Sequence, residues 1–311
     1  MSEHVEQVEA ERQFQQFSAE KTRAAGAARV TPLVAEQERS EGRDLARIGN
    51  DWTRAHYGGD FYLPHAPEGL PAVSLVFVQS RDGNTVSANP SDLGGGNTDL
   101  HLVYEGLSRV GADAVLAGAG TARGRVFFSV WRPELVALRD GLFLPRHPAQ
   151  VVMSNDGNVD VDGTLLFNVP DVPSFILAGP KCRARWRDKF EERPWITLIP
   201  TDGKDLSAAF RALRERDITR ISVVGGATTA SALIDAGLVQ DLVLTTTGKS
   251  AGTPNTPFYT GSRKLDLDLV ASKRTAVGVD QGITVEQYLV NARPARRARP
   301  AVQEAVAAAS A

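Results

Sequence analysis

The sequence predicts an α/β fold, in which a mostly parallel sheet carries helices on both faces and ends in an antiparallel edge. Several β-rich runs are apolar throughout, as expected for strands that are buried on both faces. Helical stretches separate some of these runs, which is typical of parallel strands joined by crossover helices. The last two runs, 265–272 and 283–290, follow each other without a helix, and they predict the antiparallel edge.

Residues 1–70 are expected to form an extension of helices and loops ahead of the main domain. Up to about residue 48 this segment is rich in Glu, Gln, Arg and Ala, and it carries a thin apolar stripe that includes Phe14 and Phe17. The near-helical spacing of the stripe predicts one or two surface helices, packed on the body or on a partner. A largely mobile extension is the alternative. Residues 52–71 mix aromatic residues with Gly and Pro, which predicts an ordered loop.

The main domain is expected to span residues 71–290. Its β-rich runs predict seven strands ahead of the edge pair, at 72–78, 113–118, 149–154, 174–179, 195–200, 220–225 and 241–247. Helices are predicted at 97–110, 204–217 and 227–237, the last of which ends on a glycine. The remaining segment, 291–311, is rich in Ala, Arg and Pro and predicts a disordered tail.

The composition excludes several classes of protein. Lys and Arg number 35 against 37 Asp and Glu, so the net charge of -2 favours neither nucleic acid nor an anionic membrane as a partner. The acidic start does not resemble a signal peptide, and the longest apolar run is too short to span a bilayer. Cys182 is the only cysteine, and the five histidines show no ligand spacing, so we expect no metal site. These features predict a soluble, cytoplasmic protein.

Two glycine turns each follow a predicted strand. The first is GAGTARG (118–124), and the second is GGATTASA (225–232), which opens a helix. Ligands of open α/β sheets bind at the carboxyl ends of strands, where glycine lets the backbone come close. A helix N-terminus adds free N–H groups and a partial positive charge, which suit a pyrophosphate. A plain connection remains the alternative for either turn, and neither matches the Rossmann or P-loop spacing.

Four blocks follow one another along the main domain: Ser80-Arg81-Asp82-Gly83, DAVLAGAGTARG, VVMSN (151–155) and VVGGATTASALIDAGLVQDLVL. In this order they resemble the reductase domain of riboflavin biosynthesis. The resemblance covers about residues 70–290. It implies a dihydrofolate-reductase-like three-layer sandwich, NADPH as the cofactor and a homodimer. It also implies hydride transfer to a ribosylamino-pyrimidine or a related small heterocycle.

The resemblance also implies roles for single residues. Asp82 is the catalytic candidate, either orienting or protonating the substrate, or only forming the turn before Gly83. Arg109 matches an arginine that binds the substrate phosphate. The cofactor residues come from three of the blocks: Gly118, Ala119, Gly120, Thr121, Ser154, Asn155, Gly225, Gly226, Ala227, Thr228, Thr229 and Ala230.

Two substrate positions depart from the family pattern. Val224 stands where the family has a glutamate that touches the substrate, and Arg125 stands where it has an aspartate. The loss of two acidic groups predicts weak turnover of the standard riboflavin intermediate and better activity on another small heterocycle. Arg123 and Arg125 flank the first turn, where they favour the 2′-phosphate of NADPH or an anionic substrate.

Two other functions remain open at this point. One is a dihydrofolate or pterin reductase, and the other is a descendant that binds nucleotide without turnover. A fused zinc deaminase is excluded, because a single cysteine cannot supply its metal ligands.

Overall fold

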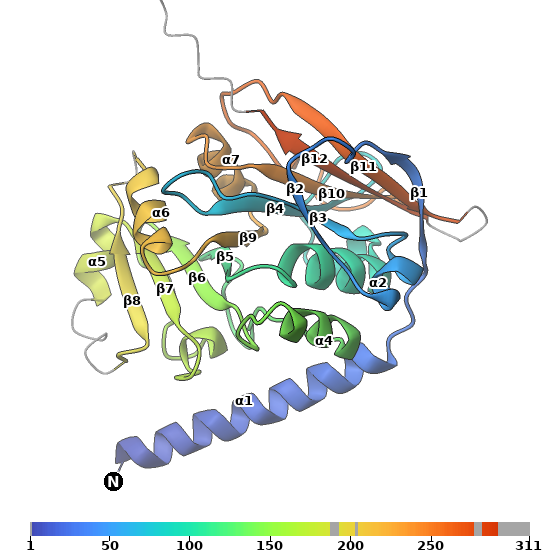
Figure 1. The fold of residues 1–311 in the computed structure, drawn as a ribbon. Helices are drawn as coiled ribbons and strands as arrows, with labels where there is room; N and C mark the ends of the chain where they lie inside the picture. Colours follow the sequence, from blue (N-terminus) through green and yellow to red (C-terminus); the bar gives the residue numbers. More distant parts are fainter. Residues whose placement is uncertain (1, 187–192, 203–204, 277–281, 292–311) are drawn as a thin grey trace, which may run out of the picture.

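A ten-stranded sheet forms the centre of the computed structural model, which describes residues 2–186, 193–202, 205–276 and 282–291 (Figure 1). The strand order is β1-β11-β12-β10-β4-β9-β5-β6-β7-β8. Seven neighbouring strands from β10 to β8 run parallel, whereas β12, β11 and β1 add antiparallel pairs at one edge. This arrangement confirms the predicted α/β class and its antiparallel edge.

The predicted strands agree with the observed ones to within a few residues. The strands of the parallel part are β4 (Ala72–Gln79), β5 (Ala114–Gly118), β6 (Ala149–Ser154), β7 (Ser174–Ala178), β8 (Ile196–Pro200), β9 (Arg220–Val224) and β10 (Asp241–Thr247). The edge strands are β11 (Leu267–Thr275) and β12 (Ile283–Val290). Every residue of β7 is buried, which is the pattern expected for a strand that is covered on both faces.

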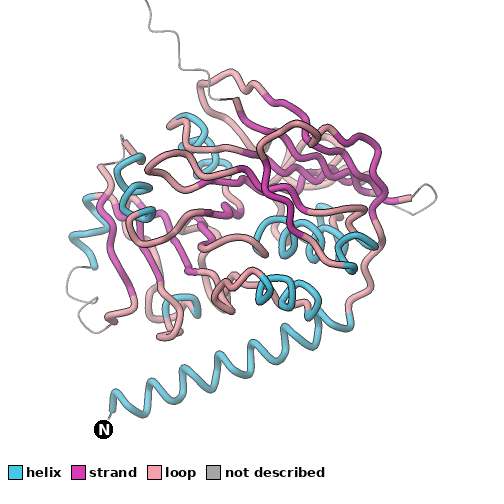
Figure 2. The backbone as a smooth tube through the Cα atoms, viewed as in Figure 1, coloured by secondary structure: helices cyan, strands magenta, loops and turns pink. Residues whose placement is uncertain are grey.

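Helices cover the two faces of the sheet, so the molecule has three layers (Figure 2). On one face, α6 (Ser207–Arg214) and α7 (Ala227–Asp235) pack their apolar side chains against the strands. The other face carries α3 (Gly96–Thr98), η2 (Asp99–Leu107), α4 (Pro133–Gly141) and α5 (Pro180–Trp186). Two short 3₁₀ turns complete the set, at η1 (Pro90–Leu93) and η3 (Leu165–Phe167).

The helix predicted at 97–110 differs from expectation in its winding. Its central part, η2, is a π-helix of nine residues, with α3 leading into it. The predicted helix at 204–217 is α6, although residues 203 and 204 lie outside the described chain. Helix α4 was not predicted. It has only nine residues and starts with Pro133 at its first position, where proline replaces an N–H that has no partner inside the helix.

The N-terminal segment contains strands as well as helices. Helix α1 (Ser2–Ala27) runs along the side of the molecule that α4 covers (Figure 1). It is followed by β1 (Leu33–Glu38), which pairs with β11, and then by the antiparallel strands β2 (Leu45–Ile48) and β3 (Phe61–Pro64), with α2 (Asp51–His56) between them in the chain. The sequence predicted no strands here. In β1 only Leu33 is buried, so the strand carries no apolar alternation.

Two further expectations concern the C-terminal tail and membrane-spanning helices. The predicted tail, 291–311, lies outside the described residues except for Asn291. Within the described part, no helix combines the length and the apolar character needed to cross a bilayer.

Candidate functional site

The two glycine turns meet at the carboxyl edge of the sheet. Strands β5 and β9 are parallel neighbours, so the turns that follow them emerge side by side. A Cβ atom on Gly118 would lie only 2.7 Å from Oγ1 of Thr229, and one on Gly225 would lie 3.3 Å from Oγ1 of Thr121. Each turn therefore packs a threonine against a glycine of the other, and a larger residue than glycine does not fit at Gly118 without displacing its neighbour.

The second turn leads directly into the N-terminus of α7. Gly225 has φ of 77°, and Gly226 has φ of 83° and ψ of 101°, a conformation that favours glycine strongly. No side chain caps α7, so the first N–H groups of the helix face the edge of the sheet. Gly226 and Thr228 are exposed, and nothing lies within 4 Å of a Cβ built on Gly120. This open cradle of backbone and hydroxyl donors fits the pyrophosphate of a dinucleotide.

The residues after β6 lie at the same edge, beyond the first turn. The hydroxyl of Ser154 accepts a hydrogen bond from the Gly157 amide at 3.1 Å and donates to the Asp156 carboxylate at 3.4 Å. Ser154 is therefore engaged in its own turn. The side chain of Asn155 is exposed and is the more accessible of the two for a cofactor.

Asp82 follows β4 at the carboxyl edge and is exposed. Its carboxylate accepts hydrogen bonds from Oγ of Ser80 at 2.7 Å and from Nδ2 of Asn84 at 3.1 Å. The hydrogen bond from Ser80 is the main reason why the pKa of Asp82 lies below its usual value. In this geometry Asp82 is an ionised residue that orders the turn at Gly83, and it lacks the proton that a general acid donates.

A cavity of about 270 Å³ lies on the α1 side of the sheet. Residues from α1, η2 and the loop after the first glycine turn form its walls. They are Phe17, Lys21, Ala24, Ala25, Ala28, Asn97, Leu100, His101, Tyr104, Glu105, Arg109, Arg125, Val126, Phe127, Phe128 and Trp131. We call this cavity the α1 pocket. Two of the three predicted substrate residues, Arg109 and Arg125, lie in it.

Arg109 is a buried cation that has no anionic partner among the described residues. Only 3% of the residue is exposed, and its guanidinium lies 3.7 Å from the centroid of the Tyr104 ring and 5.4 Å from that of Phe128. Nη1 donates to the carbonyl oxygen of Ser129 at 3.1 Å. Nε and Nη2 are buried, and neither has a hydrogen-bond partner among the described residues. An anion that enters the pocket would satisfy these two nitrogens and offset the cost of burying the charge.

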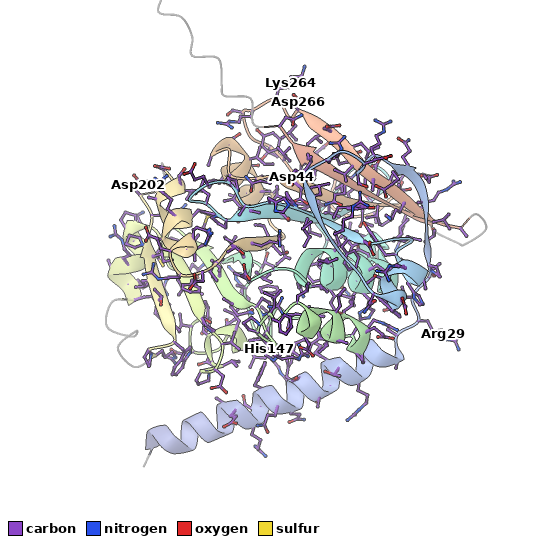
Figure 3. All side chains as sticks on the ribbon, viewed as in Figure 1. Arg29, Asp44, His147, Asp202, Lys264 and Asp266 are labelled. Carbon is purple, nitrogen blue, oxygen red and sulfur yellow. The ribbon has the colours of Figure 1, made fainter. Side chains whose placement is uncertain are left out.

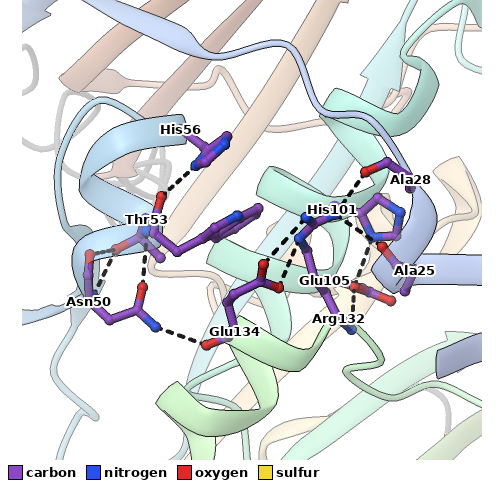
Figure 4. Close-up of polar contacts among 10 residues, drawn as sticks. Ala25, Ala28, Asn50, Thr53, His56, His101, Glu105, Arg132 and Glu134 are labelled. Carbon is purple, nitrogen blue, oxygen red and sulfur yellow. Dashed lines mark hydrogen bonds and ion pairs between the residues drawn. The ribbon is translucent and has the colours of Figure 1, made fainter. Parts of the chain in front are cut away.

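The carboxylate of Glu105, in the wall of the pocket, already has hydrogen-bond partners within the protein. Nδ1 of His101 lies 3.0 Å from Oε2 of Glu105, and both side chains are buried. The same carboxylate accepts the backbone N–H of Arg132 at 3.4 Å (Figure 4). The sequence analysis did not identify Tyr104 and Glu105 as site residues. The one signal for them was their position on the predicted helix at 97–110, shortly before Arg109.

Val224 is not among the residues that line the pocket. It is fully buried in the apolar cluster on the α1 side of the sheet, together with Val115 and Ala117. Asp82 is not in the wall of the pocket either. The structure therefore brings together Arg109 and Arg125, and separately the residues of the two glycine turns. Within the described ranges, no three His, Cys, Asp or Glu side chains gather closely enough to hold a metal ion.

His147 packs on the outer side of this site, between the sheet and α1 (Figure 3). Its ring lies 5.4 Å from that of Phe14 and 5.7 Å from that of Trp131, and Nδ1 is 2.7 Å from Oγ of Ser129. Burial, with Arg146 adding to it, lowers the pKa of His147 to about 4. The neutral ring is therefore the form that the fold prefers.

We expect this histidine to make the fold acid-sensitive. The pKa is about 6.5 in the unfolded chain and lower in the folded one, so the contribution is complete above pH 6.5 and is lost as the pH falls towards 4. Urea titrations at pH 7 and pH 4 should show wild type losing about 2–3 kcal/mol relative to His147→Phe, which does not titrate. An equal loss in both proteins would contradict this prediction. Because both proteins contain all the other titrating groups, the effects of those groups cancel in the comparison.

A family model, the RibD C-terminal domain, matches residues 71–280. A pyrimidine reductase-like protein from Corynebacterium diphtheriae has a similar structure, with a TM-score of 0.57 and 22% identity over 72% of this chain and 93% of that one. No curated protein sequence matches the chain.

Two longer proteins have a similar fold over part of their length. RibD from Acinetobacter baumannii has a TM-score of 0.53 and 17% identity, over 72% of this chain and 59% of that one. The Thermotoga maritima diaminohydroxyphosphoribosylaminopyrimidine deaminase/5-amino-6-(5-phosphoribosylamino)uracil reductase has a TM-score of 0.51 and 19% identity, over 71% and 57%. The match thus spans less than two thirds of either protein. These likenesses show a shared fold, as the sequence resemblance implies.

Proposed function

Because this chain belongs to the RibD C-terminal domain family, we propose that it is an NADPH-dependent reductase of the riboflavin-biosynthesis type. Its substrate is a small molecule, a ribosylamino-pyrimidine or a related heterocycle. The observation that carries the proposal is the meeting of the two glycine turns at the carboxyl edge, with Thr121 against Gly225 and Thr229 against Gly118. Open α/β sheets bind nucleotides at this edge.

Different residues of the cradle bind different parts of the cofactor. Bound NADPH supplies the hydride for the reaction. The exposed N-terminus of α7, which begins at Gly226, binds the pyrophosphate through backbone N–H groups. Thr121 and Thr228, whose side chains are exposed, add hydroxyl donors, and Asn155 contacts the adenosine end. Arg123 is exposed beside the first turn, where it favours the 2′-phosphate.

The α1 pocket takes the substrate in this proposal. Arg109 binds an anionic group with its two unpaired nitrogens, and Tyr104 and Phe128 hold the guanidinium in place by stacking. Asp82 orients the substrate from the end of β4 as an acceptor. The substrate differs from the standard riboflavin intermediate, because Arg125 and the buried Val224 replace two acidic contacts of the family. We also propose that the protein is a cytoplasmic homodimer, as the resemblance implies.

The cofactor preference tests this function directly. We expect NADPH to quench tryptophan fluorescence on binding and to give a kcat/KM at least about tenfold above that of NADH, because the exposed Arg123 can pair with the additional phosphate. Steady-state rates with both cofactors and one accepted heterocyclic substrate provide the ratio. A ratio near one would count against the NADPH preference. Binding without turnover on any pyrimidine or pterin would favour the nucleotide-binding alternative.

A further inference from the structure

The N-terminal helix contributes a wall of the α1 pocket, although it lies outside the region that the family model matches. That region begins at residue 71, whereas α1 ends at Ala27. The lining of the pocket includes five α1 residues or immediate neighbours: Phe17, Lys21, Ala24, Ala25 and Ala28. The remaining lining residues come from the segment 97–109, which contains η2, and from the loop at 125–131. A ligand in the pocket is therefore enclosed by α1 as well as by the main domain.

The packing of α1 over the pocket is specific. Phe17 is 5% exposed, and its ring meets that of Trp131 edge-on at 5.7 Å between centroids. Phe14 lies 4.7 Å from Phe127, again measured between ring centroids. These contacts fix two turns of the helix against the loop that also forms the pocket floor. Aromatic pairs of this kind stabilise the packing of α1 by more than the burial of their surface area alone.

Hydrogen bonds hold the end of the same helix (Figure 4). Nη1 of Arg132 donates to the carbonyl oxygens of Ala25 and Ala28, both at 3.0 Å. Nε of Arg132 forms an ion pair with Glu134 at 3.1 Å, and the carbonyl oxygen of Glu134 accepts from Asn50 at 2.8 Å. Arg132 thus donates to carbonyl groups at the end of α1, and it fixes the helix at the pocket.

Lys21 and Arg125 both lie close to the ring of Phe17. Nζ of Lys21 is 5.4 Å from the centroid of Phe17, and the guanidinium carbon of Arg125 is 5.7 Å from the same centroid. Both residues line the pocket with Arg109, whereas its one acidic lining residue, Glu105, is paired with His101. Three cations therefore face a cavity in which two buried nitrogens of Arg109 have no described partner.

We propose that α1 is part of the substrate site, and that Lys21 binds the same anionic group as Arg109. The group is a phosphate monoester on a small substrate, because three cations can neutralise its charge and share its oxygens. Phe17 is a positioning residue that supports Lys21 and Arg125. This inference rests on the proposed function, and it extends the substrate site beyond the main domain.

Ribose 5-phosphate provides a probe for this proposal. Calorimetry on the full chain in 0.15 M salt compares wild type, Lys21→Glu and the matched control Arg23→Glu. Arg23 is exposed and lies two positions further along α1, on its opposite side, and it is not a lining residue. The salt screens charges that lie more than about 8 Å from the phosphate. We expect Lys21→Glu to weaken binding at least about tenfold, and Arg23→Glu to change it less than about twofold.

Several outcomes would overturn the proposal. It fails if wild type does not bind ribose 5-phosphate, if ribose without the phosphate binds as tightly, or if the two variants weaken binding equally. NADPH binding by all three proteins is measured separately, and we expect it to be unchanged, because Lys21 is not part of the cradle. A protein that binds ribose 5-phosphate through Lys21 but does not bind NADPH would refute the proposed function alone.

Discussion

Gly226→Val is expected to weaken NADPH binding by well over tenfold, which corresponds to more than about 1.4 kcal/mol. Gly226 has φ of 83° and ψ of 101°, where a β-branched residue is strongly disfavoured. It also forms the exposed entry to α7, so the valine methyl groups would occupy the space in which we place the pyrophosphate. Calorimetric titration with NADPH measures the loss. Backbone strain and steric exclusion both lower the affinity of Gly226→Val for NADPH.

Gly141→Val is the control for introducing a valine at a glycine without backbone strain and outside the cradle. Gly141 ends α4, has no positive φ, and has nothing within 4 Å of a Cβ built on it. Gly141→Val should leave NADPH affinity within about twofold of wild type and should cost only tenths of a kcal/mol in stability. If folded Gly226→Val protein binds NADPH as wild type does, the cradle is not where the cofactor binds. Circular dichroism establishes that the variants are folded.

The parallel part of the sheet could be predicted from sequence, because its signals are local. A strand such as β7 is buried on both faces, so it is apolar over its whole length and contrasts with the polar segments beside it. Strand β1 has no such signal. It is held by backbone hydrogen bonds to β11, a strand more than 200 residues further along the chain, and most of its side chains are exposed. Pairing of this kind depends on the tertiary fold.

The glycine turns and the pocket wall also differ in how far they could be predicted from the sequence. The glycine turns could be predicted because a strand, its glycines and the following helix are contiguous, and the positive φ values of Gly225 and Gly226 supply the physical reason. The pocket wall could not, because its contacts join distant segments, as Phe17 and Trp131 do. Phe17 was identified as part of an apolar stripe, and nothing in the sequence indicated that the stripe would meet Lys21 and Arg109 at a cavity.

Arg109→Met is expected to reduce the affinity for ribose 5-phosphate by at least about thirtyfold, since hydrogen bonds to charged groups are worth about 1.5–3 kcal/mol each. The same change should not lower the stability of the ligand-free protein by more than about 1 kcal/mol. Removing one member of a buried ion pair is costly because the other charge remains. Arg109 has no carboxylate partner among the described residues, so no such charge remains. Methionine also retains an apolar contact with Tyr104 and Phe128.

Arg139 is the matched control, because it is equally buried but is bound by the fold itself. It is 1% exposed, and Nη1 donates to the carbonyl oxygens of Arg109, Val110 and Ala112. Nε donates to the carbonyl oxygen of Pro145 at 2.7 Å. Arg139→Met removes the guanidinium donor from these four carbonyl oxygens, three of them in buried hydrogen bonds, so urea titration should show a loss of more than about 3 kcal/mol. If Arg109→Met is destabilised as much as Arg139→Met and still binds ribose 5-phosphate normally, Arg109 is a structural residue. A variant that keeps its stability and loses the ligand would instead mean that the unpaired charge of Arg109 is retained for binding, since the fold does not require it.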